Sequence, residues 1–263
     1  MQFYTNGLFH IYNQGNNRQQ VFFSEANYLF FLWKMRAYLL PFGDLVAYSL
    51  MPNHFHWLFY VKEVQLPREM LKAHVAAVEQ IRKGKVAASD GVGASDGVTL
   101  SHAVTKAALA NHPTAPAPNL GASVGVTRSH ADTKAALTNH PTAPAPYITL
   151  NESIGILQRS YTRAINKSNN RSGSLFREKC KAEDGWIAEF VTLTNKKGQP
   201  DYRFLPGSGY ASHCLNYIHL NAVEANLVRQ QEDWPYSSAK DYAGQRNGNL
   251  CNIEMGKQLM RML

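Results

Sequence analysis

The fold is decided by one apolar stretch, Met51-Pro52-Asn53-His54-Phe55-His56-Trp57-Leu58-Phe59-Tyr60. Its run of aromatic and aliphatic side chains predicts a strand. Side chains alternate between the two faces of a strand, so we expect His54 and His56 to point the same way. Phe55 and Trp57 are then expected on the opposite face, in the core. Two imidazoles side by side on a rigid strand would make half of a divalent-metal site.

The elements around this strand are predicted from hydrophobic periodicity and from turn and capping residues. Strands are predicted at 8–12, 45–50, 54–62 and 186–194. Helices are predicted at 25–40, 68–83, 150–166 and 212–229, with Ser24 and Ser212 as N-caps. The second and third strands are close enough in sequence to pair as a hairpin.

The composition favours a polyanionic partner. The chain has 263 residues, which allows one or two domains, and its net charge is +8. With a sequence pI of about 9.3, nucleic acid is the simplest such partner. The three cysteines are widely spaced, so we expect reduced thiols in a cytoplasmic protein rather than a disulfide framework or a zinc ribbon. We expect no signal peptide and no membrane span.

A duplicated segment interrupts the chain. Its period is 28 residues, and Asn111-His112-Pro113-Thr114-Ala115-Pro116-Ala117-Pro118 recurs at 139–146. The copies contain no Phe, Trp or Tyr, so they bury too little apolar surface to offset the entropy of ordering. We predict that 86–146 is a low-complexity, disordered insertion in a loop. Residues 1–85 and 147–245 would then form one discontinuous domain, followed by a tail at 246–263.

A basic segment follows the insertion. Residues 159–181 contain seven Lys and Arg residues but only one acidic residue, and Tyr161 and Phe176 lie among them in the sequence. Cationic and aromatic side chains together suit single-stranded nucleic acid, although a solvated helix end would have a similar composition. The candidate nucleic-acid-binding residues are Arg18, Arg159, Arg163, Lys167, Arg171, Arg177, Lys179 and Lys181.

A second pair of candidate site residues is Tyr217 and Asn221. They are four residues apart in a predicted helix, so they share one face of it. If that helix packs beside the strand of His54 and His56, the amide oxygen of Asn221 joins the two imidazoles. Mg²⁺ or Mn²⁺ accepts such ligands and keeps positions open for a phosphate. Tyr217 would attack that phosphate and form a covalent phosphotyrosine.

Four motifs in this order resemble those of the single-tyrosine HUH transposases, in which HUH denotes His-hydrophobic-His. The most similar subgroup is the REP-associated tyrosine transposases, which act on repetitive extragenic palindromes. The resemblance covers residues 6–85 and 147–240. The four motifs are Asn13-Gln14-Gly15-Asn16-Asn17-Arg18, Leu50-Met51-Pro52-Asn53-His54-Phe55-His56, Arg171-Ser172-Gly173-Ser174-Leu175-Phe176 and Tyr217-Ile218-His219-Leu220-Asn221-Ala222-Val223.

This resemblance implies a ferredoxin-like α+β domain, in which helices pack on an antiparallel sheet. It implies His54, His56 and Asn221 as ligands of Mg²⁺ or Mn²⁺, and Tyr217 as the nucleophile. The family cuts single-stranded DNA at or beside hairpins, becomes joined to a 5′ phosphate and leaves a free 3′ hydroxyl. A bacterial, cytoplasmic and nucleoid-associated protein is expected, either a monomer or a homodimer. The duplicated insertion and a long loop at 195–209 depart from the family pattern.

Two other functions fit parts of the sequence. A domesticated relative could grip hairpin DNA or RNA without cutting it, and a metallohydrolase of small molecules would fit the histidine pair but not the basic charge. Tyr161 is an alternative nucleophile, but we expect it in the core or stacked on a base because no ligand-type residue follows four positions later. We expect His219 to contact DNA or to pack, and His10 and His213 to be structural or rim residues.

Overall fold

The computed structural model describes residues 2–89, 146–184 and 210–261. The predicted strand at 186–194, the loop at 195–209 and most of the predicted insertion at 86–146 lie outside the described residues.

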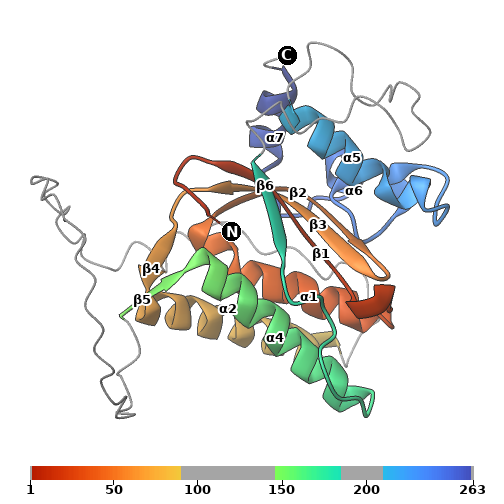
Figure 1. Cartoon of the computed structure of the whole chain (residues 1–263). Coiled ribbons are helices and arrows are strands. Elements are labelled where there is room, and N and C mark those ends of the chain that lie inside the picture. Colours follow the sequence, from red (N-terminus) through yellow and green to blue (C-terminus); the bar gives the residue numbers. More distant parts are fainter. Residues whose placement is uncertain (1, 90–145, 185–209, 262–263) are drawn as a thin grey trace, which may run out of the picture.

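Four antiparallel strands form the central sheet in the spatial order β2-β3-β1-β6 (Figure 1). They are β1 (Leu8–Gln14), β2 (Gly43–Met51), β3 (His54–Val61) and β6 (Lys181–Asp184). β2 and β3 pair as the predicted hairpin, and β1 lies between β3 and β6. With helices between β1 and β2 and between β3 and β6, this is the ferredoxin-like order. The predicted α+β fold with an antiparallel sheet is confirmed.

One face of the sheet is covered by α1 (Glu25–Tyr38), α2 (Arg68–Ser89) and α4 (Leu150–Ser168) (Figure 1). Phe55 and Trp57 point into this layer, as predicted, and both are fully buried. Phe31 of α1 lies 6.0 Å from Trp57 and 4.9 Å from Tyr161 of α4, measured between ring centroids. Each large side chain buried in this way contributes roughly 1.5–3 kcal/mol. This aromatic layer therefore fixes β3 against the helices.

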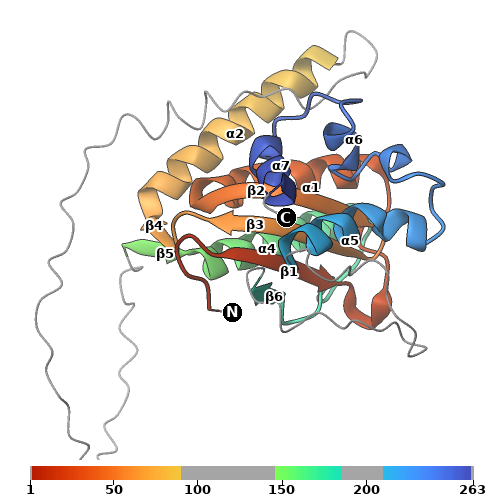
Figure 2. The same cartoon turned by 90° about the horizontal axis from the view of Figure 1, so that it is seen from above.

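The opposite face is covered by α5 (Tyr210–Glu224), α6 (Ala239–Tyr242) and α7 (Ile253–Arg261), as Figures 1 and 2 show from two directions. Leu215 and Ile218 of α5 pack in a second apolar cluster with Val46 of β2 and Leu58 of β3. The histidine face of β3 is therefore the face that α5 covers. This second layer brings residues far apart in the sequence to one site.

The predicted limits of α5 were wrong at both ends. Ser212 lies inside α5, which begins at Tyr210. The helix ends at Glu224 instead of residue 229, because Asn226 adopts the left-handed conformation with φ of 56° and terminates it. The strand β6 was not predicted; it begins at Lys181, the last residue of the basic segment. A short polar strand at the edge of a sheet has no apolar alternation to reveal it.

A small second sheet joins the end of the segment predicted to be an insertion to the residues that precede α2. β4 (Gln65–Pro67) pairs with β5 (Tyr147–Thr149). The backbone N–H of Arg68 also donates to the carbonyl of Pro146, at 2.8 Å. The chain therefore re-enters the fold beside the first residue of α2, whereas the segment predicted to be an insertion begins near the other end of that helix, which extends to Ser89. The limits predicted for the domain at 85, 147 and 245 stay predictions.

Two smaller expectations can be compared with the structure. Cys180, Cys214 and Cys251 are all free thiols. A search of the described ranges finds no helix that combines the length and the apolar character needed to cross a membrane.

His74 of α2 gives a prediction about the pH dependence of stability. Its Nε2 donates to the carbonyl of Arg36 at 3.2 Å, and burial lowers its pKa from the usual 6.5. The unfolded chain therefore binds a proton near pH 6.5 that the folded chain rejects, so stability falls as the pH drops below that value. We expect His74→Gln, which keeps a donor for Arg36 but cannot titrate, to reduce this fall by up to about 1.4 kcal/mol per pH unit.

Urea unfolding of wild type and His74→Gln, measured between about pH 8 and about pH 5, checks this expectation. Other buried histidines give both proteins a residual slope. Parallel curves for the two proteins would contradict the assignment to His74.

Candidate nucleic acid cleavage site

The strand side of the candidate site consists of alternate residues on β1 and β3. Tyr12 lies opposite His56, and Gln14 lies opposite His54. Because the period of a strand is two, these side chains share the face that α5 covers. His56 is 6% exposed, whereas His54 at the end of the strand is partly exposed. The rings of the two histidines are 5.1 Å apart and almost perpendicular.

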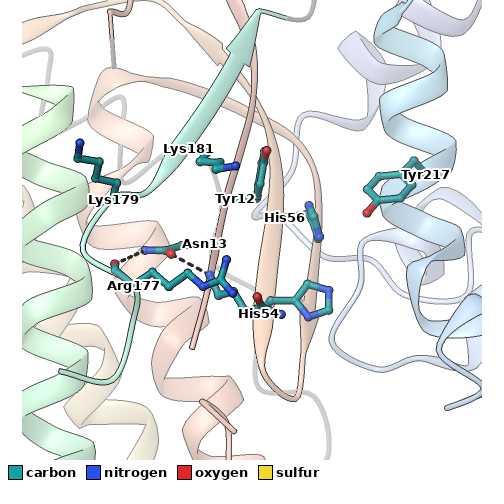
Figure 3. A pocket seen from close by; sticks show the side chains of 9 residues that line it. Tyr12, Asn13, His54, His56, Arg177, Lys179, Lys181 and Tyr217 are labelled. Carbon is teal, nitrogen blue, oxygen red and sulfur yellow. Dashed lines mark hydrogen bonds between the residues drawn. The ribbon is translucent and has the colours of Figure 1, made fainter. Parts of the chain in front are cut away.

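The helix side consists of Tyr217 and Asn221, one turn apart on α5. The ring of Tyr217 lies 5.3 Å from that of His56. The amide Oδ1 of Asn221 lies 3.3 Å from Nε2 of His54. The two residues therefore share one helix face, as predicted, and it faces the histidines. In Figure 3 the hydroxyl of Tyr217 points from α5 toward the strand that carries His56. The four predicted site residues come together.

The turn after β1 holds the start of β3 in place. The backbone N–H of Gly15 donates to the carbonyl of Asn53 at 2.8 Å, and Gly15 also forms a bridge with Phe176. A Cβ on Gly15 would lie 2.2 Å from the carbonyl oxygen of Gln19, so only glycine fits here. The turn thereby joins the histidine strand to the basic segment that precedes β6.

His54 is oriented through both ring nitrogens. Its Nδ1 contacts Oδ1 of Asn53 at 2.6 Å, and its Nε2 faces Oδ1 of Asn221. Burial lowers the pKa of His54, and the hydrogen bond with Asn221 opposes this shift. The charged ring donates to both oxygens, but the neutral ring has one N–H, and the shorter contact assigns it to Nδ1, which donates to Asn53. Lone pairs on Nε2 and on the Asn221 oxygen then face each other. A cation between these two atoms would satisfy both.

His56 is held in the neutral form. Burial lowers its pKa well below 6.5, and the positive charges that His10 and His54 would carry lower it further. Its Nδ1 lies 2.9 Å from Nε2 of His10. Burial also lowers the pKa of His10 to about 4, although the nearby carboxylate of Glu183 opposes this. Neutral imidazole is the form that binds metal ions.

These donors fit a hard divalent ion. Octahedral ligands of Mg²⁺ or Mn²⁺, at about 2.1 Å from the ion, lie about 3 Å from their neighbours. The separation of 3.3 Å between His54 Nε2 and Asn221 Oδ1 is close to that value. The described part of the chain contains no group of three or more His, Cys, Asp or Glu side chains that could hold a metal. The candidate set instead joins two imidazoles to one amide oxygen and leaves positions open for phosphate.

A pocket of about 250 Å³ opens beside these residues (Figure 3). His54, His56 and Tyr217 form part of its wall. The remaining lining residues are Tyr12, Asn13, Gln14, Arg177, Lys179 and Lys181. The carbonyl of Arg177 accepts a hydrogen bond of 3.1 Å from Asn13 Nδ2, which fixes the basic segment against β1. Three cationic residues therefore line the same pocket as the tyrosine and the histidines.

A solved structure described as a REP-associated tyrosine transposase bound to a REP hairpin is similar to this chain. The similarity covers 96% of this chain and 92% of that one, with a TM-score of 0.41 and 13% sequence identity. No protein-family model matches the chain, and no curated protein matches it.

The eight predicted nucleic-acid-binding residues fall into two groups. Arg177, Lys179 and Lys181 line the pocket. The others lie away from it: Arg159, Arg163 and Lys167 are exposed on α4, in the layer behind the sheet, and Arg18 and Arg171 belong to the adjoining turns.

The other sequence candidates pack in the interior. Tyr161 is fully buried, and its hydroxyl donates to the carbonyl of Val21 at 3.0 Å, as expected for a core residue. His219 is buried against Ser238, with 2.9 Å between Nε2 and Oγ. His213 is also buried.

Three residues that line the pocket were not among the site residues predicted from the sequence. They are consecutive on β1: Tyr12, Asn13 and Gln14. The expected strand ended at Tyr12, so the last two were assigned to a turn. His10 was expected to be a structural or rim residue, yet it contacts His56 directly. The available signal was alternation, because residues 10, 12 and 14 share a face once β1 is known to reach Gln14.

Proposed function

We propose that the protein is a metal-dependent transferase that cleaves and rejoins single-stranded DNA at or near palindromic hairpins through a 5′-phosphotyrosine. One observation carries this proposal. Tyr217 and Asn221 of α5 meet His54 and His56 of β3 beside a pocket with a cationic wall. A nucleophile, metal-type donors and phosphate-binding cations are the parts that phosphodiester transfer requires.

Three of the four residues would be metal ligands, and the fourth would be the nucleophile. His54, His56 and Asn221 would hold Mg²⁺ or Mn²⁺. When bound, such an ion polarises the phosphate and offsets charge on the leaving oxygen. The hydroxyl of Tyr217 would give its proton to solvent, and its oxygen would form a bond to phosphorus while the bond to the 3′ oxygen breaks. That oxygen takes a proton from solvent and leaves as a 3′ hydroxyl.

The covalent bond to Tyr217 explains why rejoining needs no ATP. The phosphotyrosine retains the energy of the broken phosphodiester, so attack by a 3′ hydroxyl restores a DNA strand and releases the tyrosine. Both steps transfer the same phosphate. The protein would therefore act both as an endonuclease and as a ligase.

The cationic residues would guide the DNA to Tyr217. Arg177, Lys179 and Lys181 would contact phosphates next to the cleaved bond, because they line the same pocket. The exposed basic residues of α4 would contact the hairpin farther away. An enzyme with this activity would work on bacterial chromosomal DNA, in the cytoplasm at the nucleoid.

Dependence on metal is the first test of this function. Purified protein is incubated with labelled single-stranded hairpin DNA from its own genomic flanks, with Mn²⁺ or with EDTA, and analysed on a denaturing gel. We expect a covalent band with Mn²⁺ and at least about a hundredfold less of it with EDTA, since the ion supplies several kcal/mol to the transition state.

The same samples on a native gel separate the proposed function from its alternative. A shifted native band without any covalent band would support a domesticated protein that binds hairpin DNA or RNA but does not cleave it. A covalent band of equal strength in EDTA would contradict the role of the metal.

A further inference from the structure

His10 on β1 contacts His56 but has no role in the proposed function as described above. It is 6% exposed, and its Nε2 lies 2.9 Å from Nδ1 of His56. The two rings lie 26° from parallel, with centroids 5.1 Å apart. Only one of the two facing nitrogens can carry the shared hydrogen, so this contact selects a tautomer for each ring.

The tautomer of His56 decides whether it can bind a metal through Nε2. A neutral histidine that coordinates through Nε2 carries its hydrogen on Nδ1 and donates it to a neighbouring group. His54 already has this arrangement, with Nδ1 against the amide oxygen of Asn53 at 2.6 Å. In His56 the corresponding partner is His10. Both histidines of the pair therefore have Nδ1 in contact with a polar partner.

The surroundings of His10 hold its ring in place. Glu183 is its direct neighbour on β6. The carboxylate of Glu183 also accepts a hydrogen bond of 2.6 Å from the hydroxyl of Tyr12. The rings of Tyr12 and His10 lie 5.0 Å apart. These packed neighbours on two strands hold the ring of His10 against His56.

We propose that His10 is a positioning residue: its Nε2 accepts the hydrogen of His56 Nδ1 and so leaves the lone pair of His56 on Nε2, where it could bind the ion together with His54 and Asn221. This inference rests on the proposed function, because it assigns His10 a role in the same site. His10 touches neither the DNA nor the ion in this arrangement. It acts through His56, and its ring also packs 5.9 Å from that of Tyr217, a contact that phenylalanine can keep.

The direct test is the tautomer of His56, observed by ¹⁵N NMR of the full chain without metal or DNA. The spectra are recorded at about pH 8, where ordinary histidines are neutral. We expect His56 of the wild type to be protonated on Nδ1. In His10→Phe, which keeps a ring but lacks an acceptor, we expect a mixture of tautomers. In His10→Gln, whose amide oxygen occupies a place similar to Nε2, we expect the wild-type tautomer.

Binding of Mn²⁺ alone is the second readout. We expect the Kd for Mn²⁺ to rise about 10–100-fold in His10→Phe and to return to within a few-fold of wild type in His10→Gln. A purely structural role would change unfolding in both variants but would not produce this rescue. If His10→Phe fails to fold, the proposal is still tested by the tautomer of His56 in the wild type and by the tautomer and Mn²⁺ affinity of His10→Gln.

Wild-type His56 protonated on Nε2 would overturn the proposal, and so would unchanged tautomer and Mn²⁺ affinity in a folded His10→Phe. Failure of the proposed function has a different signature. It would appear as a wild-type protein that forms no covalent adduct with hairpin DNA, whatever the tautomer of His56.

Discussion

Replacing Tyr217 with phenylalanine is expected to abolish the covalent DNA adduct and to lower strand cleavage roughly a thousandfold or more. Phenylalanine keeps the ring that packs 5.3 Å from His56 but lacks the oxygen that would attack phosphorus. The cationic residues of the pocket wall are unchanged, so we expect the Kd for the hairpin to stay within about threefold of wild type. A denaturing gel measures the adduct, and a native gel or fluorescence anisotropy measures the Kd.

Tyr161→Phe is the matched control. It makes the same chemical change at the other tyrosine that the sequence offered as a nucleophile. Its hydroxyl is buried against the carbonyl of Val21, so we expect a loss of about 1 kcal/mol in stability and a wild-type adduct. An adduct lost in Tyr161→Phe but kept in Tyr217→Phe would reverse the assignment. Equal loss of binding and adduct in Tyr217→Phe would also refute the nucleophile role.

Removing the donors that face each other across the site is expected to have the second largest effect. We expect His54→Ala and Asn221→Leu each to lower adduct formation about a hundredfold, because each removes one ligand of the ion. Asn221→Asp keeps an oxygen in the same place and adds charge, so we expect it to bind Mn²⁺ more tightly than wild type. Titration with Mn²⁺ measures the affinity, and the denaturing gel measures the adduct.

His219→Gln is the control for damage to α5. His219 lies two residues before Asn221 and contacts Ser238 Oγ in the interior, a contact that glutamine can also make. We expect this variant to keep wild-type Mn²⁺ affinity and adduct. If Asn221→Leu bound Mn²⁺ as tightly as wild type, the amide oxygen would not be a ligand. The set would then reduce to the two histidines.

Much of the candidate site could be predicted from local periods in the sequence. A period of two places His54 and His56 on one face of β3 and sends Trp57 to the other, whatever the rest of the chain does. A helical turn likewise places Tyr217 and Asn221 on one face of α5. The limits of elements were predicted less well, because Asn226 ends α5 through its backbone conformation and not through an apolar pattern.

The sequence by itself determined which side chains share a face of a strand or helix, and it showed the excess of basic residues. Both can be read from residues that are close together in the chain. Only the tertiary structure decided that these faces meet. The pairing of β1 with β3 brings His10 against His56 across 46 residues of sequence. Packing of α5 on the sheet brings Asn221 to His54 across 167 residues. Such contacts depend on burying two apolar layers at once, and no local period encodes that choice of partners.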